Sequence, residues 1–148
     1  MGRTILGTRI LGGLAIAGVL LGAPAAWAET YIVATTADGG PGSLRQAVID
    51  ANANPGADTI YLLDETYRLA IPGQGEEAAA TGDLDVAPGG LTVSGDGADR
   101  TFIDGAGLDT VFDVQAGAVL EVYNITITGG VAPSGGMQGG NFNVAGSL

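Results

Sequence analysis

The sequence contains no cysteine, no histidine and no lysine among its 148 residues. Without histidine or cysteine the chain cannot form the usual nucleophilic triads, which need a histidine base or a thiol. Zinc sites of the common kind are excluded for the same reason. Without cysteine there is also no disulfide framework, so the folded chain depends on burial and hydrogen bonding alone.

Positive charge is scarce. Two of the five basic residues lie within the first nine positions, which leaves Arg45, Arg68 and Arg100 against 16 acidic residues and a net charge of −13 beyond that start. Nucleic acids and anionic lipids both need a basic face, so we exclude them as partners. The balance is typical of an exported acidic protein.

The first 28 residues predict a secretory signal peptide. Residues 1–9 contain two arginines, residues 10–22 are apolar, and Ala26-Trp27-Ala28 forms an A-x-A cleavage pattern. We expect cleavage after Ala28. The alternative is an uncleaved membrane anchor, which the apolar run is too short to favour, since a spanning helix needs about 20 residues. No later segment is apolar enough to span a membrane as a helix.

Residues 91–130 are a series of very short strands that end at Gly, Asn or Asp. The predicted strands cover residues 91–95, 101–105, 111–114, 120–122 and 125–129. Two of these segments repeat after 24 residues, with Ile103 matching Ile127, and two repeat after 29, with Leu91 matching Leu120. Three short strands in each 24–29-residue repeat predict a parallel β-helix, a solenoid of strands.

Alternate residues of a strand point to opposite faces, so each predicted strand supplies two inward side chains. We expect Phe102 to point outward and Asn124 to occupy a corner at positive φ. The alternative fold is an antiparallel sandwich, which is disfavoured by the periodic offsets and by the absence of the hairpin dipeptide Asn-Gly. The expected inward pairs are Leu91 and Val93, Thr101 and Ile103, Phe112 and Val114, Leu120 and Val122, and Ile125 and Ile127.

Residues 43–53 predict one amphipathic helix. Ser43 and Gln46 form a capping-box pattern, and Pro55 ends the helical stretch. We expect Arg45 on the polar face and an apolar face that packs as a lid on the open end of the solenoid. The apolar face consists of Leu44, Ala47, Val48 and Ala51.

Further strands are expected at residues 31–36, 59–63, 67–71, 83–86 and 141–144. The chain therefore divides into a signal peptide (1–28), an N-terminal cap with the helix and first strands (29–90), and incomplete β-helix turns (91–148). Because only about two turns are complete and solenoids generally need three or more repeats, we expect the fold to be truncated at the C-terminus. An exposed strand edge there predicts edge-to-edge self-association.

Residues 41–60 resemble the CSLREA domain family. The hexad that gives this family its name corresponds here to residues 42–47, Gly-Ser-Leu-Arg-Gln-Ala, with Gly in place of Cys and Gln in place of Glu. The resemblance implies an exported bacterial protein with a right-handed parallel β-helix of the pectin-lyase-like kind. Such domains occur near polymorphic outer membrane proteins and adhesin-like proteins, which implies a secreted or cell-surface location.

No residue is assigned a catalytic role. Asp104, Asp109 and Asp113 are expected near corners, where aspartate is ordinary turn chemistry. Calcium is the candidate cofactor, because carboxylates gather in two loops. Its candidate ligands are Asp83, Asp85, Asp96 and Asp99, with Glu76 and Glu77 beside the first pair. The alternative is that both loops are simply solvated acidic segments.

Together these patterns favour a non-catalytic secreted or cell-surface module, adhesin-like or structural, that contacts polysaccharide or another surface protein. One alternative is the N-terminal part of a polysaccharide lyase or hydrolase whose active site lies in turns beyond this chain. The other is a calcium-stabilised surface scaffold. A lyase needs a basic residue to abstract a proton, and the predicted strands of residues 101–129 contain none.

Overall fold

The computed structural model describes residues 27–132 and 140–144, which form ten strands and one helix. The predicted signal peptide lies outside these residues except for its last two. Among the described residues, no helix has the length and apolarity that a membrane crossing requires. The elements are β1 (Thr30–Ile32), α1 (Leu44–Ala53), β2 (Ala57–Tyr61), β3 (Thr66–Arg68), β4 (Leu84–Val86), β5 (Gly89–Ser94), β6 (Phe102–Asp104), β7 (Phe112–Val114), β8 (Ala118–Tyr123), β9 (Thr126–Thr128) and β10 (Phe142–Val144).

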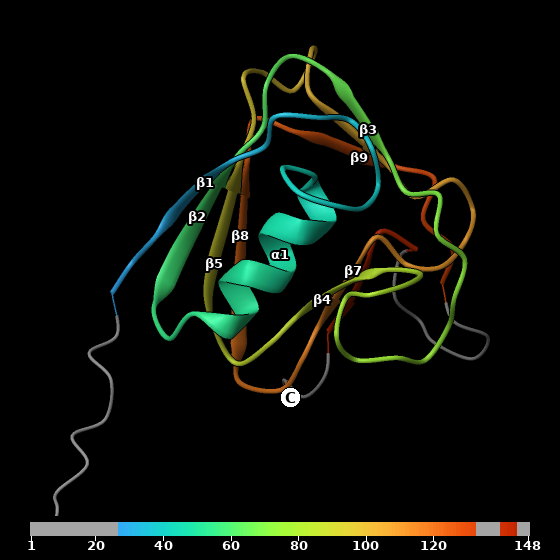
Figure 1. Ribbon diagram of the computed structural model, residues 1–148. Helices are drawn as coiled ribbons and strands as arrows, with labels where there is room; N and C mark the ends of the chain where they lie inside the picture. Colours follow the sequence, from blue (N-terminus) through green and yellow to red (C-terminus); the bar gives the residue numbers. More distant parts are fainter. Residues whose placement is uncertain (1–26, 133–139, 145–148) are drawn as a thin grey trace, which may run out of the picture.

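The strands form three sheets, and every strand pair is parallel. Sheet A has the order β1-β2-β5-β8, sheet B the order β3-β6-β9, and sheet C the order β4-β7-β10. From β2 onward, successive strands therefore enter sheets A, B and C in a fixed rotation. Figure 1 shows the sheets around a common interior, with α1 in front of them, where it packs against β1, β2 and β4.

The register within the sheets confirms both predicted repeats. Leu91 pairs with Leu120 across β5 and β8, an offset of 29 residues, and Ile103 pairs with Ile127 across β6 and β9, an offset of 24. The predicted inward residues of β5, β6 and β7 are buried, while the next predicted inward residues, Leu120, Val122, Ile125 and Ile127, are half-buried. Asn124 has a φ of 57° and occupies the predicted corner.

The helix forms where the sequence predicts it. Ser43 is the N-cap, and its hydroxyl accepts a hydrogen bond from the Gln46 N–H at 3.1 Å. The capping box is only half formed, because the Gln46 side chain donates to Asp50 instead. All four residues of the predicted apolar face, Leu44, Ala47, Val48 and Ala51, are buried in the core. Burial of Leu44 and Val48 contributes about 1.5–3 kcal/mol each.

The expectation that Arg45 lies on the polar face is wrong. Arg45 is only 2% exposed, and its guanidinium makes five hydrogen bonds. Two go to the Asp38 carboxylate, at 3.0 and 3.3 Å, and three to the carbonyls of Ala79, Gly82 and Asp83, at 2.8–2.9 Å. The segment before β4 covers this part of α1, so a residue that would be exposed on an isolated helix is enclosed with all five donors used.

Side chains in and before α1 also satisfy backbone groups at the outer edges of sheets B and C. The Asn52 side chain donates to the Asp85 carbonyl at 2.8 Å and accepts from the Ala87 N–H at 3.0 Å, along β4. Asp38 accepts from the N–H groups of residues 70–71, just after β3, at 2.6 and 2.8 Å. In sheet A, strand β1 pairs with β2 and covers the corresponding edge. These contacts pair polar groups that an edge strand otherwise exposes.

Candidate metal centre

Two aspartates lie side by side on the outer face of sheet C. Asp85 is the middle residue of β4 and Asp113 the middle residue of β7, and the two are partners in the parallel register. The residues flanking each aspartate are buried apolar side chains, such as Leu84 and Phe112. Because side chains alternate along a strand, inward-facing neighbours direct both carboxylates to the opposite face.

The segment between β3 and β4, residues 69–83, folds over Asp85. We call it the β3–β4 loop. The Ala79 N–H donates to the Asp85 Oδ2 at 2.7 Å, and Ala79 is itself buried, with a φ of 56°. Glu76 holds the loop in shape by accepting from the N–H groups of Ala78 and Thr81 at 3.1 and 2.8 Å. Because the loop covers it, Asp85 is fully buried.

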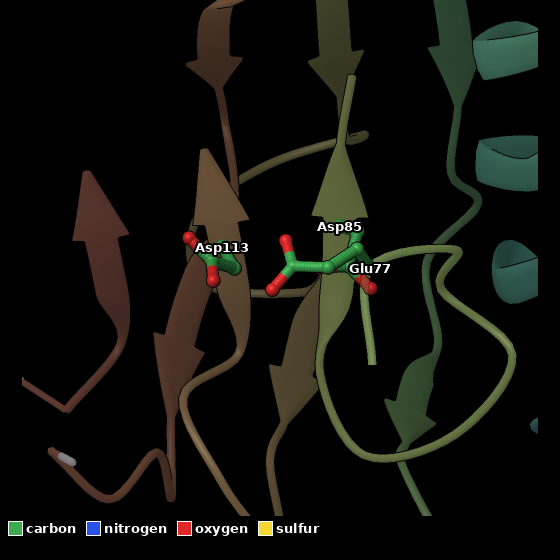
Figure 2. Close-up of side chains that lie close together, drawn as sticks. All are labelled: Glu77, Asp85 and Asp113. Atoms are coloured by element: carbon green, nitrogen blue, oxygen red, sulfur yellow. The ribbon is translucent and has the colours of Figure 1, made fainter. Parts of the chain in front are cut away.

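The same loop brings a third carboxylate to the pair. Oxygens of Glu77, Asp85 and Asp113 all lie within 4.8 Å of one another, and Figure 2 shows the three side chains together at β4 and β7. The Gln115 amide donates to the Glu77 carbonyl at 3.0 Å and to its carboxylate at 3.3 Å, which helps to position Glu77. Glu77 is exposed, Asp113 is half-buried, and the buried Oδ1 of Asp85 has no hydrogen-bond partner.

Burial and the neighbouring carboxylates disfavour the charged forms of Asp85 and Asp83. Burial raises the pKa of Asp85 to about 7, and the charges of Asp83, Glu76 and Glu77 act in the same direction against the opposing Ala79 N–H. Burial also raises the pKa of Asp83, although the Thr110 hydroxyl, which donates to its carboxylate at 2.9 Å, works against the shift.

The arginines of the described residues pair with carboxylates elsewhere. Arg45 pairs with Asp38, as described above, and Arg68 lies 3.5 Å from Asp104. Arg100 lies near three exposed carboxylates, the nearest of which is Asp96 at 3.3 Å. Among the described arginines, each one therefore pairs with a carboxylate outside the group formed by Glu77, Asp85 and Asp113.

The structure does not bring the four predicted calcium ligands together. Asp83 and Asp85 are buried beside sheet C. Asp96 and Asp99 lie in a different turn, where their carboxylates are 3.3 and 3.9 Å from the Arg100 guanidinium. Only Asp85 of the four belongs to the three-carboxylate cluster.

The expectation that Asp113 lies near a corner is wrong, because it is the middle residue of β7. Asp104 ends β6 and accepts from the Ala106 N–H at 2.9 Å, and Asp109 accepts from the Thr110 N–H at 2.8 Å, as turn residues do. The sequence did contain a signal for the Asp85–Asp113 pair. Leu-Asp-Val at residues 84–86 and Phe-Asp-Val at 112–114 share the same pattern at an offset of 28 residues.

No protein-family model, curated protein or solved structure matches this chain. The likeness of residues 42–47 to the CSLREA hexad therefore stays a resemblance. The structure does give these residues physical roles: Ser43 caps α1, Leu44 and Ala47 enter the core, and Arg45 ties the helix to the β3–β4 loop. The function has to be argued from the fold and the carboxylate cluster.

Proposed function

We propose that this chain is an exported, non-catalytic module with a right-handed parallel β-helix fold, and that it serves an adhesin-like or structural role at the cell surface or outside the cell. The observation that carries the proposal is the fixed rotation of successive strands through three parallel sheets. In a parallel β-helix each turn places one strand on each face, directly beside the corresponding strand of the turn before.

The cap-like contacts of α1 support this interpretation. A stack of parallel strands ends in an apolar opening and in unpaired backbone groups, which a terminal unit has to cover. Here α1 buries four apolar side chains, and Asn52 and Asp38 bond to backbone groups along β4 and just after β3. In this proposal, residues 29–56 are the part of the N-terminal cap (29–90) that covers the end of the β-helix.

The state of the arginines favours a non-catalytic role. A lyase acting on acidic polysaccharide needs a basic group that can abstract a proton, and cations that neutralise uronate carboxylates. Arg45 is enclosed and fully hydrogen-bonded, while Arg68 and Arg100 lie in exposed ion pairs on the surface. A surface of this charge suits a spacer or a binding module for polysaccharide or another surface protein better than a uronate site.

Cysteine cross-linking tests the proposed fold, because the chain has no cysteine of its own. Thr92 and Glu121 are register partners on β5 and β8, so their Cα atoms are about 4.8 Å apart, within reach of a disulfide. We expect Thr92→Cys/Glu121→Cys to oxidise to an intramolecular disulfide. Thr92→Cys/Tyr123→Cys is the control, with Cα atoms about 8 Å apart. Equal or absent cross-linking in both variants would contradict the parallel stack.

Cell fractionation and an activity assay test the rest of the proposal. Expressed from its own start in a bacterial host, the chain should be found outside the cytoplasm with Glu29 as its first residue. Retention of the full-length chain in the cytoplasm would contradict export. The purified chain should release no fragments from uronate-containing polysaccharides, and measurable turnover would contradict the non-catalytic role.

A further inference from the structure

We propose that Glu77, Asp85 and Asp113 bind one calcium ion, which fastens the β3–β4 loop to the outer face of sheet C. The site combines two strands that the fold places in register with one loop that closes over them. Of the ligands that the sequence predicts, it keeps Asp85 together with Glu77 from the same acidic loop, and it adds Asp113 from β7.

The spacing of the carboxylates suits calcium. Calcium binds oxygen at about 2.3–2.6 Å, so two oxygens on the same ion lie at most about 5 Å apart. The three residues each offer an oxygen within 4.8 Å of the other two. Magnesium demands a near-ideal octahedron at about 2.0–2.1 Å and is usually bound by only one or two carboxylates, whereas three carboxylates from two strands and a loop meet here. Calcium also accepts irregular ligand sets completed by water, and the exposed Glu77 leaves room for water.

The buried oxygen of Asp85 is the second, independent observation. Asp85 is fully buried, its Oδ2 accepts from the Ala79 N–H, and its Oδ1 has no partner among the described residues. Buried polar atoms are nearly always hydrogen-bonded or bound to an ion, because an unpaired one costs about 1–3 kcal/mol. A cation held between Glu77 and Asp113 would provide the missing partner.

Charge balance points the same way. Three carboxylates, one of them buried, meet here, and a bound cation would offset their charge. The described arginines pair with other carboxylates. Without a cation, the buried carboxyl of Asp85 has to keep a proton or tolerate the nearby charge of Glu77. The competing explanation is therefore a proton held by Asp85 in place of a metal, and the experiment distinguishes the two.

Binding is measured by titrating calcium chloride into the full chain after treatment with a chelator, and the melting temperature is recorded with and without calcium. We expect one saturable site in the submillimolar to millimolar range that is typical of extracellular calcium modules, and a rise in melting temperature. Glu77→Gln and Asp113→Asn should each weaken binding at least tenfold and abolish the rise. Glu121→Gln is the matched control, because Glu121 is an exposed outward carboxylate on β8, and it should bind as the wild type does.

Glu77→Gln should melt in chelator no lower than the wild type, because it removes one of the repelling charges. Glu77 is exposed, so Glu77→Gln by itself decides the question if Asp113→Asn does not fold. The proposal is overturned if calcium shows no saturable binding, if Glu77→Gln binds it unchanged, or if magnesium binds more tightly. These outcomes are independent of export and of catalysis, so they leave the proposed function untouched.

Discussion

Replacing Arg45 with methionine should destabilise the protein more than any surface substitution. Methionine keeps most of the apolar stem and removes the guanidinium. The substitution leaves the carbonyls of Ala79, Gly82 and Asp83 without their donor and deprives Asp38 of its cation. The effect falls on the junction between α1 and the β3–β4 loop.

The magnitude follows from burial. Arg45 and Asp38 have side chains that are only 2% and 5% exposed, and removal of one partner from a buried ion pair costs about 3–5 kcal/mol. Each orphaned carbonyl adds about 1–3 kcal/mol unless water reaches it. Because water will enter part of the space, the terms do not add fully, and we expect a total loss of about 4–6 kcal/mol. Domains of this size have only about 5–15 kcal/mol of stability, so the variant will be close to unfolding.

Urea denaturation followed by circular dichroism measures the difference. Arg68→Met is the matched control: Arg68 is 67% exposed and 3.5 Å from Asp104, so its loss should cost under about 1 kcal/mol. Arg45→Lys should fall between the two, because an ammonium keeps the charge but has three donors in place of five. If Arg45→Met lost no more stability than Arg68→Met, the buried network would contribute nothing net and the reasoning would be wrong.

Two further predictions concern β4. Burial raises the pKa of the Asp85 carboxyl from an ordinary value of 3.8 to about 7, so without metal the folded state keeps a proton that the unfolded chain releases between these values. The free energy of unfolding should therefore fall as pH rises through that interval, by up to about 1.4 kcal/mol per pH unit. Asp85→Asn should remove this slope, and chelator-treated urea melts at several pH values that gave parallel profiles for the two proteins would contradict the shift. Asn52→Ala should cost about 2 kcal/mol by removing two hydrogen bonds along β4, and should speed amide exchange at Ala87; unchanged exchange there would show that Asn52 does not protect this edge.

The sequence alone determined the local and the repeating features. Ser43 and the apolar spacing that follows it specify the helix, because capping and helical periodicity act within a few residues. The matches of Leu91 with Leu120 and of Ile103 with Ile127 specify the pairing within sheets A and B, because strands that repeat the same inward pattern bury it only when aligned. Corner residues such as Asn124 followed from their tolerance of positive φ.

The tertiary structure alone decided which polar side chains are enclosed. The carbonyl partners of Arg45 lie 34–38 residues further along the chain, in a loop without periodicity, so helical spacing placed Arg45 on the solvent side. Likewise, Glu77 meets Asp85 and Asp113 only because that loop folds over sheet C. Local patterns record which face of an element is apolar, whereas the burial of a charge depends on which distant segment covers it and supplies its partners.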